Sequence, residues 1–493
     1  MFFKPHMRMP PGRIFLVIAD IFCIFASIIL SAILRLTPSI GWAYVLRHLP
    51  SLLGSSLVFL VVFYAGGMYE QPLLERRTGS FVLSFVTTAI GLALVILFFY
   101  ARFQLHIGRG ILLLAGLFVC LSSWGVRQLY RTAVGYGLLS RNTLIVGEGK
   151  EAVDVLQLLS ASPDAGFRVF GVVSCTKSRP GAFVEGIPVL GHMSRLREFA
   201  DVYSIETIVV AASLAREHAL LRLLRPLRYM GIEILDYVTL SEEIAQEIPL
   251  DHVDDEWLMN AAMNSSVIHI RKIKRVMDLT VSVLGLILLA PVWLIAALVI
   301  RLDSRGPVLY RQRRAGLEGH PYTLYKLRTM RQDAEASSGA VWADRYDSRI
   351  TRVGRFLRKW RIDEIPQLIN VLRGEMSLVG PRPERPEFID TLAEAIPFYR
   401  ERLLVPPGIS GWAQVKYPYA ASIEAARRKL QYDLYYIKHM SLFLDIIVLL
   451  RTFRTILVGL RHSDEFETEE SGATGKVISI EQLNPGAEVK RAG

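Results

Sequence analysis

Two acidic side chains stand next to each other in the segment "RIDEIPQLIN", residues 361–370. Asp363 and Glu364, which we call the acid pair, lie between two isoleucines, and a proline follows. Apolar neighbours and a proline indicate a fixed position rather than a solvated run of charge. Adjacent residues of a helix do not face each other, so the two carboxylates would diverge. The pattern therefore predicts two different tasks for the two acids, not one shared proton.

Basic side chains at defined positions accompany the acid pair. In "YTLYKLRTM", the two-residue period of a strand would place Lys326 and Arg328 on the same side. In "SLVGPRPERPEF", Arg382 lies between two prolines, which fix the backbone around it. A guanidinium binds phosphate through two parallel hydrogen bonds. These cations suit a polyanion such as a diphosphate, and acids among them suit a nucleophile or a metal ligand. Mg²⁺ is typically held by one or two carboxylates plus substrate phosphates.

A structural explanation of Asp363 remains open beside the catalytic one. Asp is a preferred N-cap residue, and Glu364 and Pro366 would then occupy the first helical turn. Because a helix N-terminus also favours bound phosphate, capping and catalysis can coexist. The sequence around the acid pair does not decide between them.

The composition indicates a membrane protein with anionic partners. Hydrophobic residues make up 52% of the chain, and the net charge is +11. The high apolar content favours membrane lipid or phosphorylated substrates over nucleic acid as the anionic partner. The cysteines at 23, 120 and 175 form neither a close pair nor a metal-binding spacing, so no disulfide framework is implied.

Four apolar runs dominate the first 130 residues. Each approaches the ~20 residues that a helix needs to cross a bilayer. Basic residues before the first run and after the last favour both ends in the cytoplasm. We therefore predict a four-helix transmembrane bundle over residues 1–135. The runs cover residues 14–34, 50–68, 81–101 and 110–126.

The next hundred residues change character. Residues 140–240 alternate apolar strand patterns with helical ones, which predicts a Rossmann-like α/β domain with a parallel sheet. The segment "GEGKEA", residues 147–152, matches a GxGxxA dinucleotide fingerprint after a strand. The following strand ends at Ser174 and Cys175, with no acid to bind a ribose, so we expect a structural turn and assign no cofactor. We interpret residues 241–268 as a linker and residues 463–493 as a disordered polar tail.

A fifth apolar run, residues 281–300, is long enough to cross a membrane, but basic residues flank it on both sides. Both flanks therefore prefer the cytoplasmic face. Pro291 breaks the helix in the middle and frees a carbonyl that needs a partner inside the protein, for which Ser282 is a donor of suitable type. A re-entrant helix–break–helix hairpin over 276–301 explains these features, and a kinked spanning helix explains them equally well. Residues 349–361 and 442–460 are amphipathic and predicted to lie at the membrane surface.

The motifs resemble, in order, the bacterial sugar transferases that act on polyprenyl phosphate, the monotopic phosphoglycosyl transferases. The resemblance extends over about 271–460, and we place the catalytic domain at 269–462. It rests on "KRVMDLTVSVLGLILLAPVWLIAALVI" with the basic segment that follows, then "IDEIPQLINVLRGEMSLVGPRP", "PPGISGWAQV" and "YDLYYIKHMSLFLD". The preceding bundle and α/β domain resemble the large, hexose-1-phosphate branch associated with exopolysaccharides.

The resemblance implies a specific reaction. A hexose-1-phosphate would pass from a UDP-sugar to polyprenyl (undecaprenyl) phosphate with release of UMP, the initiating step of exopolysaccharide or other surface glycan synthesis. Asp363 would form an aspartyl-phosphosugar intermediate, and Glu364 would hold Mg²⁺. Substrate phosphate would be bound by Lys326, Arg328 and Arg382. The catalytic domain would face the cytoplasm at the bacterial inner membrane, and the family leaves room for a homo-oligomer.

The sequence departs from the family pattern at one place, and two alternative functions also fit parts of it. The family often reads "GWAQVNG", whereas this chain reads "GWAQVKYPYAAS", so Lys416 and Tyr417 alter a loop near the substrate and leave the sugar open. A membrane-anchored nucleotide-binding regulatory protein would use residues 140–240 and would not need Asp363. A glycosyltransferase that moves the sugar without its phosphate would release UDP instead of UMP.

Overall fold

The computed structural model divides the chain into two units, residues 1–246 and 247–493, which are described separately. The predicted tail, 463–493, and most of the second half of the predicted linker lie outside the described residues. The structure describes residues 11–36, 38–66, 68–69, 77–101, 108–135, 140–162, 165–176, 182–211, 218–253, 255, 267–331, 349–417 and 422–458.

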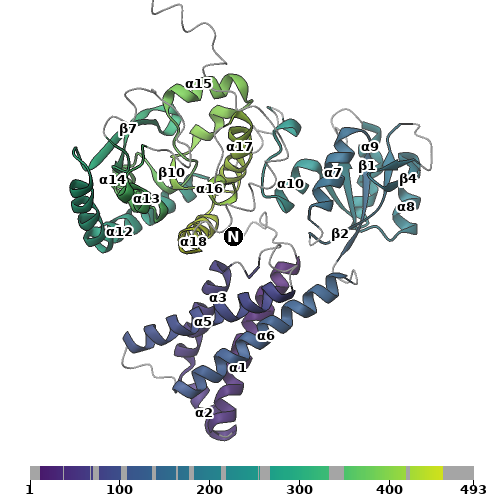
Figure 1. Cartoon of the computed structure of the whole chain (residues 1–493). Helices are drawn as coiled ribbons and strands as arrows, with labels where there is room; N and C mark the ends of the chain where they lie inside the picture. The colour runs from purple at the N-terminus through teal and green to yellow at the C-terminus, as the bar shows by residue number, and fades with distance from the viewer. Residues whose placement is uncertain are drawn as a thin grey trace, which may run out of the picture. The chain divides into compact units, whose positions relative to one another are not determined.

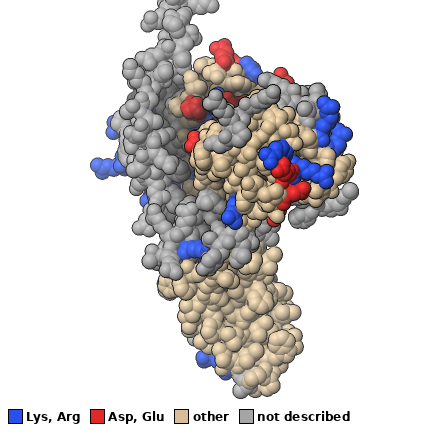
Figure 2. Space-filling model, turned by 90° about the vertical axis from the view of Figure 1, so that its right-hand side faces the viewer, with Lys and Arg blue, Asp and Glu red and all other residues tan. Residues whose placement is uncertain are grey.

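The first part of unit 1 is helical (Figure 1). The four predicted apolar runs lie in α1, α3, α5 and α6, and the short α2 meets α3 at an angle of 79°. In this part α1 and α6 are each long and apolar enough to cross a membrane, and α2 with α3 qualifies as one bent pair. In Figure 2 this helical part lies at the bottom of the view, and most of its visible surface is uncharged, with Lys and Arg toward its two ends. The helices are α1 (Pro11–Leu36), α2 (Pro38–Arg47), α3 (Leu49–Ala65), α5 (Arg77–Ala101) and α6 (Arg109–Gly135).

A buried ion pair joins α1 to α6. The two carboxylate oxygens of Asp20 accept hydrogen bonds of 3.1 and 2.8 Å from the Arg127 guanidinium. Ser123, one turn before the arginine, accepts from the same guanidinium through its hydroxyl and its carbonyl. Both charged side chains are excluded from solvent, where a bidentate geometry is needed to offset the cost of desolvation. The pair therefore fixes the register of the two helices.

The second part of unit 1 is the predicted α/β domain. Its sheet has the order β3-β4-β2-β1-β5-β6 and is parallel except for the β3–β4 pair. Alternate residues of β1 point to opposite faces, Leu144 toward α8 and α9 and Ile145 toward α7 and α10. Helices thus cover both faces (Figure 1). The strands are β1 (Arg141–Gly147), β2 (Phe167–Ser174), β3 (Phe183–Val184), β4 (Ile187–His192), β5 (Thr207–Ala211) and β6 (Glu233–Asp236), and the helices are α7 (Lys150–Ser160), α8 (Leu196–Val202), α9 (His218–Tyr229) and α10 (Tyr237–Ile244).

The glycine-rich turn between β1 and α7 is bonded to the end of β2 by the side chain of Glu148, a residue of the turn itself. The carboxylate of Glu148 accepts hydrogen bonds from the Ser174 hydroxyl at 2.8 Å and the Thr176 amide at 3.1 Å. A Cβ on Gly147 would lie 2.2 Å from the carbonyl oxygen of Ala211, whereas a Cβ on Gly149 would meet no atom within 4 Å. These contacts favour the structural interpretation of the turn.

Unit 2 contains the predicted catalytic domain. A β-hairpin, a short parallel pair and several helices make up its body. The strands are β7 (Leu309–Ala315), β8 (Pro321–Leu327), β9 (Ser377–Val379) and β10 (Gly408–Ser410), and the short 3₁₀ helices are η5 (Ile362–Glu364) and η6 (Tyr399–Leu404). The α-helices are α12 (Val267–Asp303), α13 (Arg352–Lys359), α14 (Gln367–Arg373), α15 (Pro386–Ala395), α16 (Trp412–Lys416), α17 (Ile423–Lys438) and α18 (Leu442–Val458).

The predicted helix–break–helix hairpin is a single helix in the structure. α12 runs through Pro291 without interruption, and residues 270–303 form one stretch that is long and apolar enough to cross a membrane. The hydroxyl of Ser282 is buried and has no hydrogen-bond partner among the described residues, so it does not satisfy the carbonyl that the proline frees. Only 11% of this apolar window is buried, which leaves most of the helix surface for lipid.

Both ends of α12 are fastened to the body of unit 2. Near the start, Arg275 donates to the Val371 and Leu372 carbonyls at the end of α14. Near the end, Ala296 and Ile300 pack against Leu327 of β8 and Leu357 of α13. The apolar helix is therefore built into the domain rather than attached to it by a linker.

The predicted linker 241–268 is divided by the structure. Its start, up to Ile244, completes α10, whereas the segment from Glu247 onward packs on α17. There the Ile248 amide donates to the Gln431 carbonyl at 3.1 Å, and Glu247 forms an ion pair with Arg428 at 3.1 Å.

A matched pair of substitutions tests the glycine turn. Gly147→Ala should lower the free energy of unfolding by about 3 kcal/mol, because its methyl group collides with the Ala211 carbonyl oxygen. Gly149→Ala should cost only about 1–2 kcal/mol, because it meets open space and is strained only by its φ of +73°. Thermal unfolding of both variants in detergent measures the difference. Equal stability of Gly149→Ala and wild type, together with a nucleotide-induced rise in the wild-type unfolding temperature, would instead mark the turn as a ligand site.

Candidate active site

The acid pair lies in η5, directly before α14. The residue that caps η5 is Arg361, in the left-handed region at φ +52°, and the N-cap of α14 is Pro366. Asp363 therefore caps neither helix, which excludes the capping explanation. Both acids are 7% exposed, and a strained non-glycine residue two positions before Asp363 is typical of a functional site.

Three cations surround the Glu364 carboxylate. Its Oε1 accepts from the Lys326 ammonium at 3.1 Å and from the Arg382 guanidinium at 3.3 Å. Its Oε2 accepts from the Arg361 guanidinium at 3.3 Å. Although burial opposes ionisation, Lys326, Arg382 and Arg361 hold the pKa of Glu364 well below its usual range. Glu364 is therefore a fixed negative charge that gathers cations from three different segments.

Asp363 has the opposite environment. Its carboxylate makes no hydrogen bond to any of the described residues. Burial, and then the charge of Glu364, raise the pKa of Asp363 to about 6. Near neutral pH the carboxylate is thus mostly ionised, yet it is poorly solvated and unpaired. A carboxylate in that state is more nucleophilic than a solvated one.

The hairpin and a proline-rich loop bring the cations to the acid pair. Lys326 comes from β8, where it pairs with Tyr310 of β7. Arg382 comes from the loop after β9, and its side chain remains about half exposed. Burial lowers the pKa of the Lys326 ammonium, and the charge of Glu364 opposes that shift. The structure therefore brings together four of the five predicted catalytic and phosphate-binding residues, which are Asp363, Glu364, Lys326 and Arg382.

Arg328 is the predicted site residue that the structure places elsewhere. Its guanidinium donates to the Arg305 carbonyl at 2.8 Å and to the carbonyl and hydroxyl of Ser304. Because these groups lie at and just beyond the C-terminus of α12, Arg328 anchors the membrane helix to the hairpin rather than contacting the acid pair. Conversely, Arg361 contacts Glu364, although the sequence pattern assigned it to the surface of a basic amphipathic helix.

A second buried network lies beneath β9. Asp445 of α18 accepts from the Lys274 ammonium at 2.6 Å and from the Tyr436 hydroxyl at 2.7 Å. The Leu378 amide of β9 donates to Asp278 of α12 at 3.1 Å. Asp445 is fully buried, so α18 is not simply a surface-lying helix as its sequence predicts. The network ties α12, α17 and α18 to the strand from which the Arg382 loop begins.

The departure from the family pattern lies on α16. The Lys416 ammonium stands 5.1 Å from the centroid of the Trp412 ring, and Arg451 of α18 stands 5.0 Å from the same ring. Two cations thus approach one indole, an arrangement that each can stabilise by cation–π attraction. The residues directly after Tyr417 lie outside the described part of the chain.

The acid pair supplies too few ligands to hold a metal ion alone, so a metal here would need further ligands from phosphate groups. Within the described residues no group of three or more His, Cys, Asp or Glu side chains could hold an ion. Both oxygens of Glu364 already accept from cations, so a metal at Glu364 would have to displace one of them. Asp363 is open to a ligand. The donor set fits an Mg²⁺ that arrives with substrate phosphates and takes one or two carboxylates from the protein.

Comparisons with known proteins agree with the motifs and the geometry. The family of bacterial sugar transferases matches residues 269–459. A CoA-binding domain family matches residues 64–235, which include α5, α6 and nearly all of the six-stranded sheet. The first match contains the acid pair, Lys326 and Arg382.

Named relatives cover different parts of the chain. The N-acetylgalactosaminephosphotransferase that acts on UDP-N-acetylgalactosamine and undecaprenyl phosphate in Aeromonas hydrophila is 44% identical over 220 residues, which are 45% of this chain and 51% of that protein. The UDP-glucose:undecaprenyl-phosphate glucose-1-phosphate transferase of Caulobacter vibrioides is 45% identical over 186 residues, 37% of this chain and 69% of that protein. This chain thus spans about half the length of the first relative.

A third relative extends the similarity beyond the catalytic domain. The UDP-glucose:undecaprenyl-phosphate glucose-1-phosphate transferase of Escherichia coli K12 is 31% identical over 345 residues, which cover 69% of this chain and 72% of that protein. The chain therefore belongs to the bacterial sugar transferase family, which includes these undecaprenyl-phosphate sugar-1-phosphate transferases.

Proposed function

We propose that this protein transfers a sugar-1-phosphate from a UDP-sugar to undecaprenyl phosphate and releases UMP. The observation that carries the proposal is the contrast within the acid pair. Asp363 is buried, unpaired and ionised near neutral pH, whereas Glu364 is held by three cations. The names of the relatives supply the class of donor and acceptor.

In the first step Asp363 is the nucleophile. A carboxylate oxygen attacks the sugar-bearing phosphorus of the UDP-sugar and forms a new O–P bond. The bond from that phosphorus to the bridging oxygen breaks, and UMP leaves with the bonding electron pair. The product is a phosphosugar linked to Asp363, so one difficult displacement is divided into two easier ones.

In the second step undecaprenyl phosphate is the nucleophile. One of its phosphate oxygens attacks the same phosphorus, the bond to Asp363 breaks, and the carboxylate recovers its electron pair. The lipid product carries the sugar through a diphosphate. Because UMP leaves as a weakly basic phosphate, with a second pKa of about 6, its departure needs no separate proton donor.

Lys326 and Arg382 would stabilise the charge that moves during both steps. Glu364 holds the two cations 3.1 and 3.3 Å from its Oε1, beside the nucleophile. Fixed cations that are already in place cost no reorganisation when charge develops on the phosphate oxygens. The primary role of Glu364 would then be to position these cations.

Mg²⁺ is proposed as the cofactor that accompanies the diphosphate. It would screen phosphate charge, with Asp363 or Glu364 as a protein ligand and phosphate oxygens and water as the others. Our sequence-based assignment of the metal to Glu364 would require one of its three cations to be displaced.

The membrane helix determines where the two substrates meet. Both ends of α12 are fastened to the body that carries the acid pair, and its apolar surface is largely uncovered. We propose that α12 enters and leaves the cytoplasmic face of the bacterial inner membrane as a re-entrant helix bent at Pro291. The site would then lie where a soluble UDP-sugar and a lipid phosphate are both accessible, and its product would begin an exopolysaccharide or another surface glycan.

The reaction itself is tested by its products. Membranes that contain the protein are incubated with undecaprenyl phosphate and a panel of UDP-sugars that includes UDP-glucose and UDP-N-acetylgalactosamine. We expect UMP and a lipid-linked phosphosugar for at least one donor. UDP in place of UMP would mean that the sugar is transferred without its phosphate.

The nucleophile is tested by one substitution. Asp363→Asn should abolish turnover, because an amide oxygen is a poor nucleophile, and the protein should remain folded. Incubating wild-type protein with the accepted UDP-sugar and no lipid should leave a phosphosugar on a peptide that contains Asp363, detectable by mass spectrometry. A folded Asp363→Asn protein with substantial activity would sink the covalent mechanism.

The different environments of the two acids predict opposite effects on stability. Glu364→Gln should lower the free energy of unfolding at pH 7 by about 1–3 kcal/mol, because it leaves the partly buried Lys326 without its ion-pair partner. Asp363→Asn should leave stability unchanged or raise it, since burial disfavours the charge at that position. The sign follows from the pKa directions: a depressed pKa means that ionised Glu364 stabilises the fold at pH 7, and a raised pKa means that ionised Asp363 does not. Thermal unfolding of both variants provides the measurement, and a larger loss for Asp363→Asn would contradict the assignment.

Membrane topology is tested with single cysteines. Lys272→Cys and Arg305→Cys, in a variant without the three native cysteines, should both resist a membrane-impermeant thiol reagent added to intact cells, because both flanks are basic. Arg47→Cys, between the predicted first two spans, should be labelled and so confirm that the reagent works. Labelling at only one of positions 272 and 305 would show that α12 crosses the membrane.

A further inference from the structure

The loop that carries Arg382 is fixed mainly through its carbonyl groups. Residues 380–384 include two prolines, which have no N–H to donate. The Pro381 carbonyl accepts from the Gly408 amide at 2.9 Å, and the Glu384 carbonyl accepts from the Ala315 amide at 3.0 Å. These two bonds hold the ends of the loop against β10 and β7.

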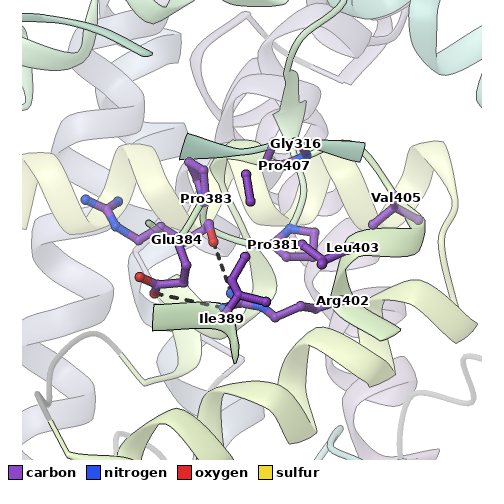
Figure 3. Close-up of a pocket in the computed structure, with 11 residues that line it drawn as sticks. Gly316, Pro381, Pro383, Glu384, Ile389, Arg402, Leu403, Val405 and Pro407 are labelled. Carbon is purple, nitrogen blue, oxygen red and sulfur yellow. Dashed lines mark hydrogen bonds and ion pairs between the residues drawn. The ribbon is translucent and has the colours of Figure 1, made fainter. Parts of the chain in front are cut away.

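Two arginine side chains hold the two carbonyls in between. Arg402 of η6 donates to the Arg382 carbonyl at 3.0 Å, and Arg314 of β7 donates to the Pro383 carbonyl at 3.0 Å. Figure 3 shows dashed lines from the Arg402 guanidinium to a carbonyl oxygen of this loop and to the Glu384 carboxylate, in the pocket that these residues line. Every carbonyl from residue 381 to residue 384 therefore has a donor.

The two arginines, which we call the arginine clamp, are themselves held by acids. Arg402 is 7% exposed, forms an ion pair with Asp433 of α17 at 2.9 Å and donates to the Tyr399 hydroxyl at 2.7 Å. The Glu384 carboxylate lies 3.9 Å from Arg402 and 3.8 Å from Arg314. A buried guanidinium with its charge matched and its hydrogen bonds satisfied is a rigid support, because any displacement would leave a buried charge unpaired.

We propose that Arg402 and Arg314 are positioning residues, which fix the backbone from which Arg382 reaches Glu364 and the substrate diphosphate. This inference rests on the proposed function, since it assigns Arg382 to phosphate binding. The arginine clamp contacts the loop through main-chain carbonyls and the Glu384 carboxylate, and it forms no ion pair with the acid pair. A displacement of about 1 Å in a charged group at a reacting centre can cost about 100-fold in rate. A rigid support for the Arg382 backbone can therefore raise the rate enough to offset the cost of burying the charges that build it.

The proposal predicts that the effect of the arginine clamp depends on Arg382. Arg402→Lys keeps the positive charge beside Asp433 but cannot reproduce the planar fork that reaches Asp433, Tyr399 and the Arg382 carbonyl together. With Arg382 present, this change should weaken binding of UDP about tenfold and lower kcat/KM by a similar or larger factor. In an Arg382→Ala background, where no guanidinium remains to be positioned, Arg402→Lys should change UDP binding less than twofold.

The experiment is a double-mutant cycle on full-length protein in nanodiscs. UDP affinity is measured by calorimetry for wild type, Arg402→Lys, Arg382→Ala and the double variant, so the readout does not depend on residual turnover. The matched control is Arg400→Ala, two residues from Arg402 in η6. Its ion pair with Asp390 is exposed, and we expect no change in UDP affinity or activity. Arg314→Lys is carried through the same cycle.

Two outcomes decide the proposal. Non-additive losses, large with Arg382 and small without it, support positioning through Arg382. Equal losses in both backgrounds overturn it and leave the arginine clamp a general stabiliser of the fold. If Arg402→Lys does not fold, Asp433→Asn replaces it in the cycle, because it retains Arg402 and removes only its ionic partner. Failure of the proposed function is separate: wild-type protein would then form no UMP from any UDP-sugar, whatever the cycle shows.

Discussion

The site depends on one electrostatic constraint: a buried carboxylate keeps a low pKa only where nearby cations match its charge. Glu364 is 7% exposed, and its oxygens are matched by Lys326, Arg361 and Arg382. These cations come from a strand, from the residue before the 3₁₀ turn and from a proline-rich loop. One fixed negative charge thereby determines where three segments meet. It also concentrates positive charge at the place where a diphosphate would bind.

The same arrangement separates the two acids. Because the cations are engaged with Glu364, the neighbouring Asp363 is left buried without a hydrogen bond from the described residues, and its pKa is raised to about 6 by burial and by Glu364. Two adjacent residues of the same chemical type therefore have different properties at neutral pH. The arginine clamp extends this logic outward, since the buried Arg402 and the partly buried Arg314 are matched by Asp433 and Glu384. Charge matching in low dielectric thus links the acid pair to the body of the domain.

The membrane helix is integrated into this network. Lys274 of α12 is paired with Asp445 beneath β9, and Arg328 of the hairpin holds the carbonyls of Ser304 and Arg305 at the far end of α12. The strand and the hairpin that supply Arg382 and Lys326 are therefore bonded to the long apolar helix. The α/β domain of unit 1 has its own two-sided core and closes its glycine-rich turn with Glu148.

The sequence by itself determined what local spacing controls. Apolar runs, alternating strands and the adjacent acids follow from covalent order, so the helices, the sheet domain and the placement of Lys326 and Arg382 among the acids could be predicted. Tertiary structure decided what depends on residues far apart in the chain. The period of two assigned Arg328 to the site, but contacts with the end of α12 draw it away. Arg402 donates to the main-chain carbonyl of Arg382, 20 residues before it in the sequence. No local pattern distinguishes Arg402 from the exposed Arg400. The physical reason is that periodicity specifies which way a side chain points from its own element, whereas the pairing of a buried charge is set by whichever distant group the fold brings within hydrogen-bond distance.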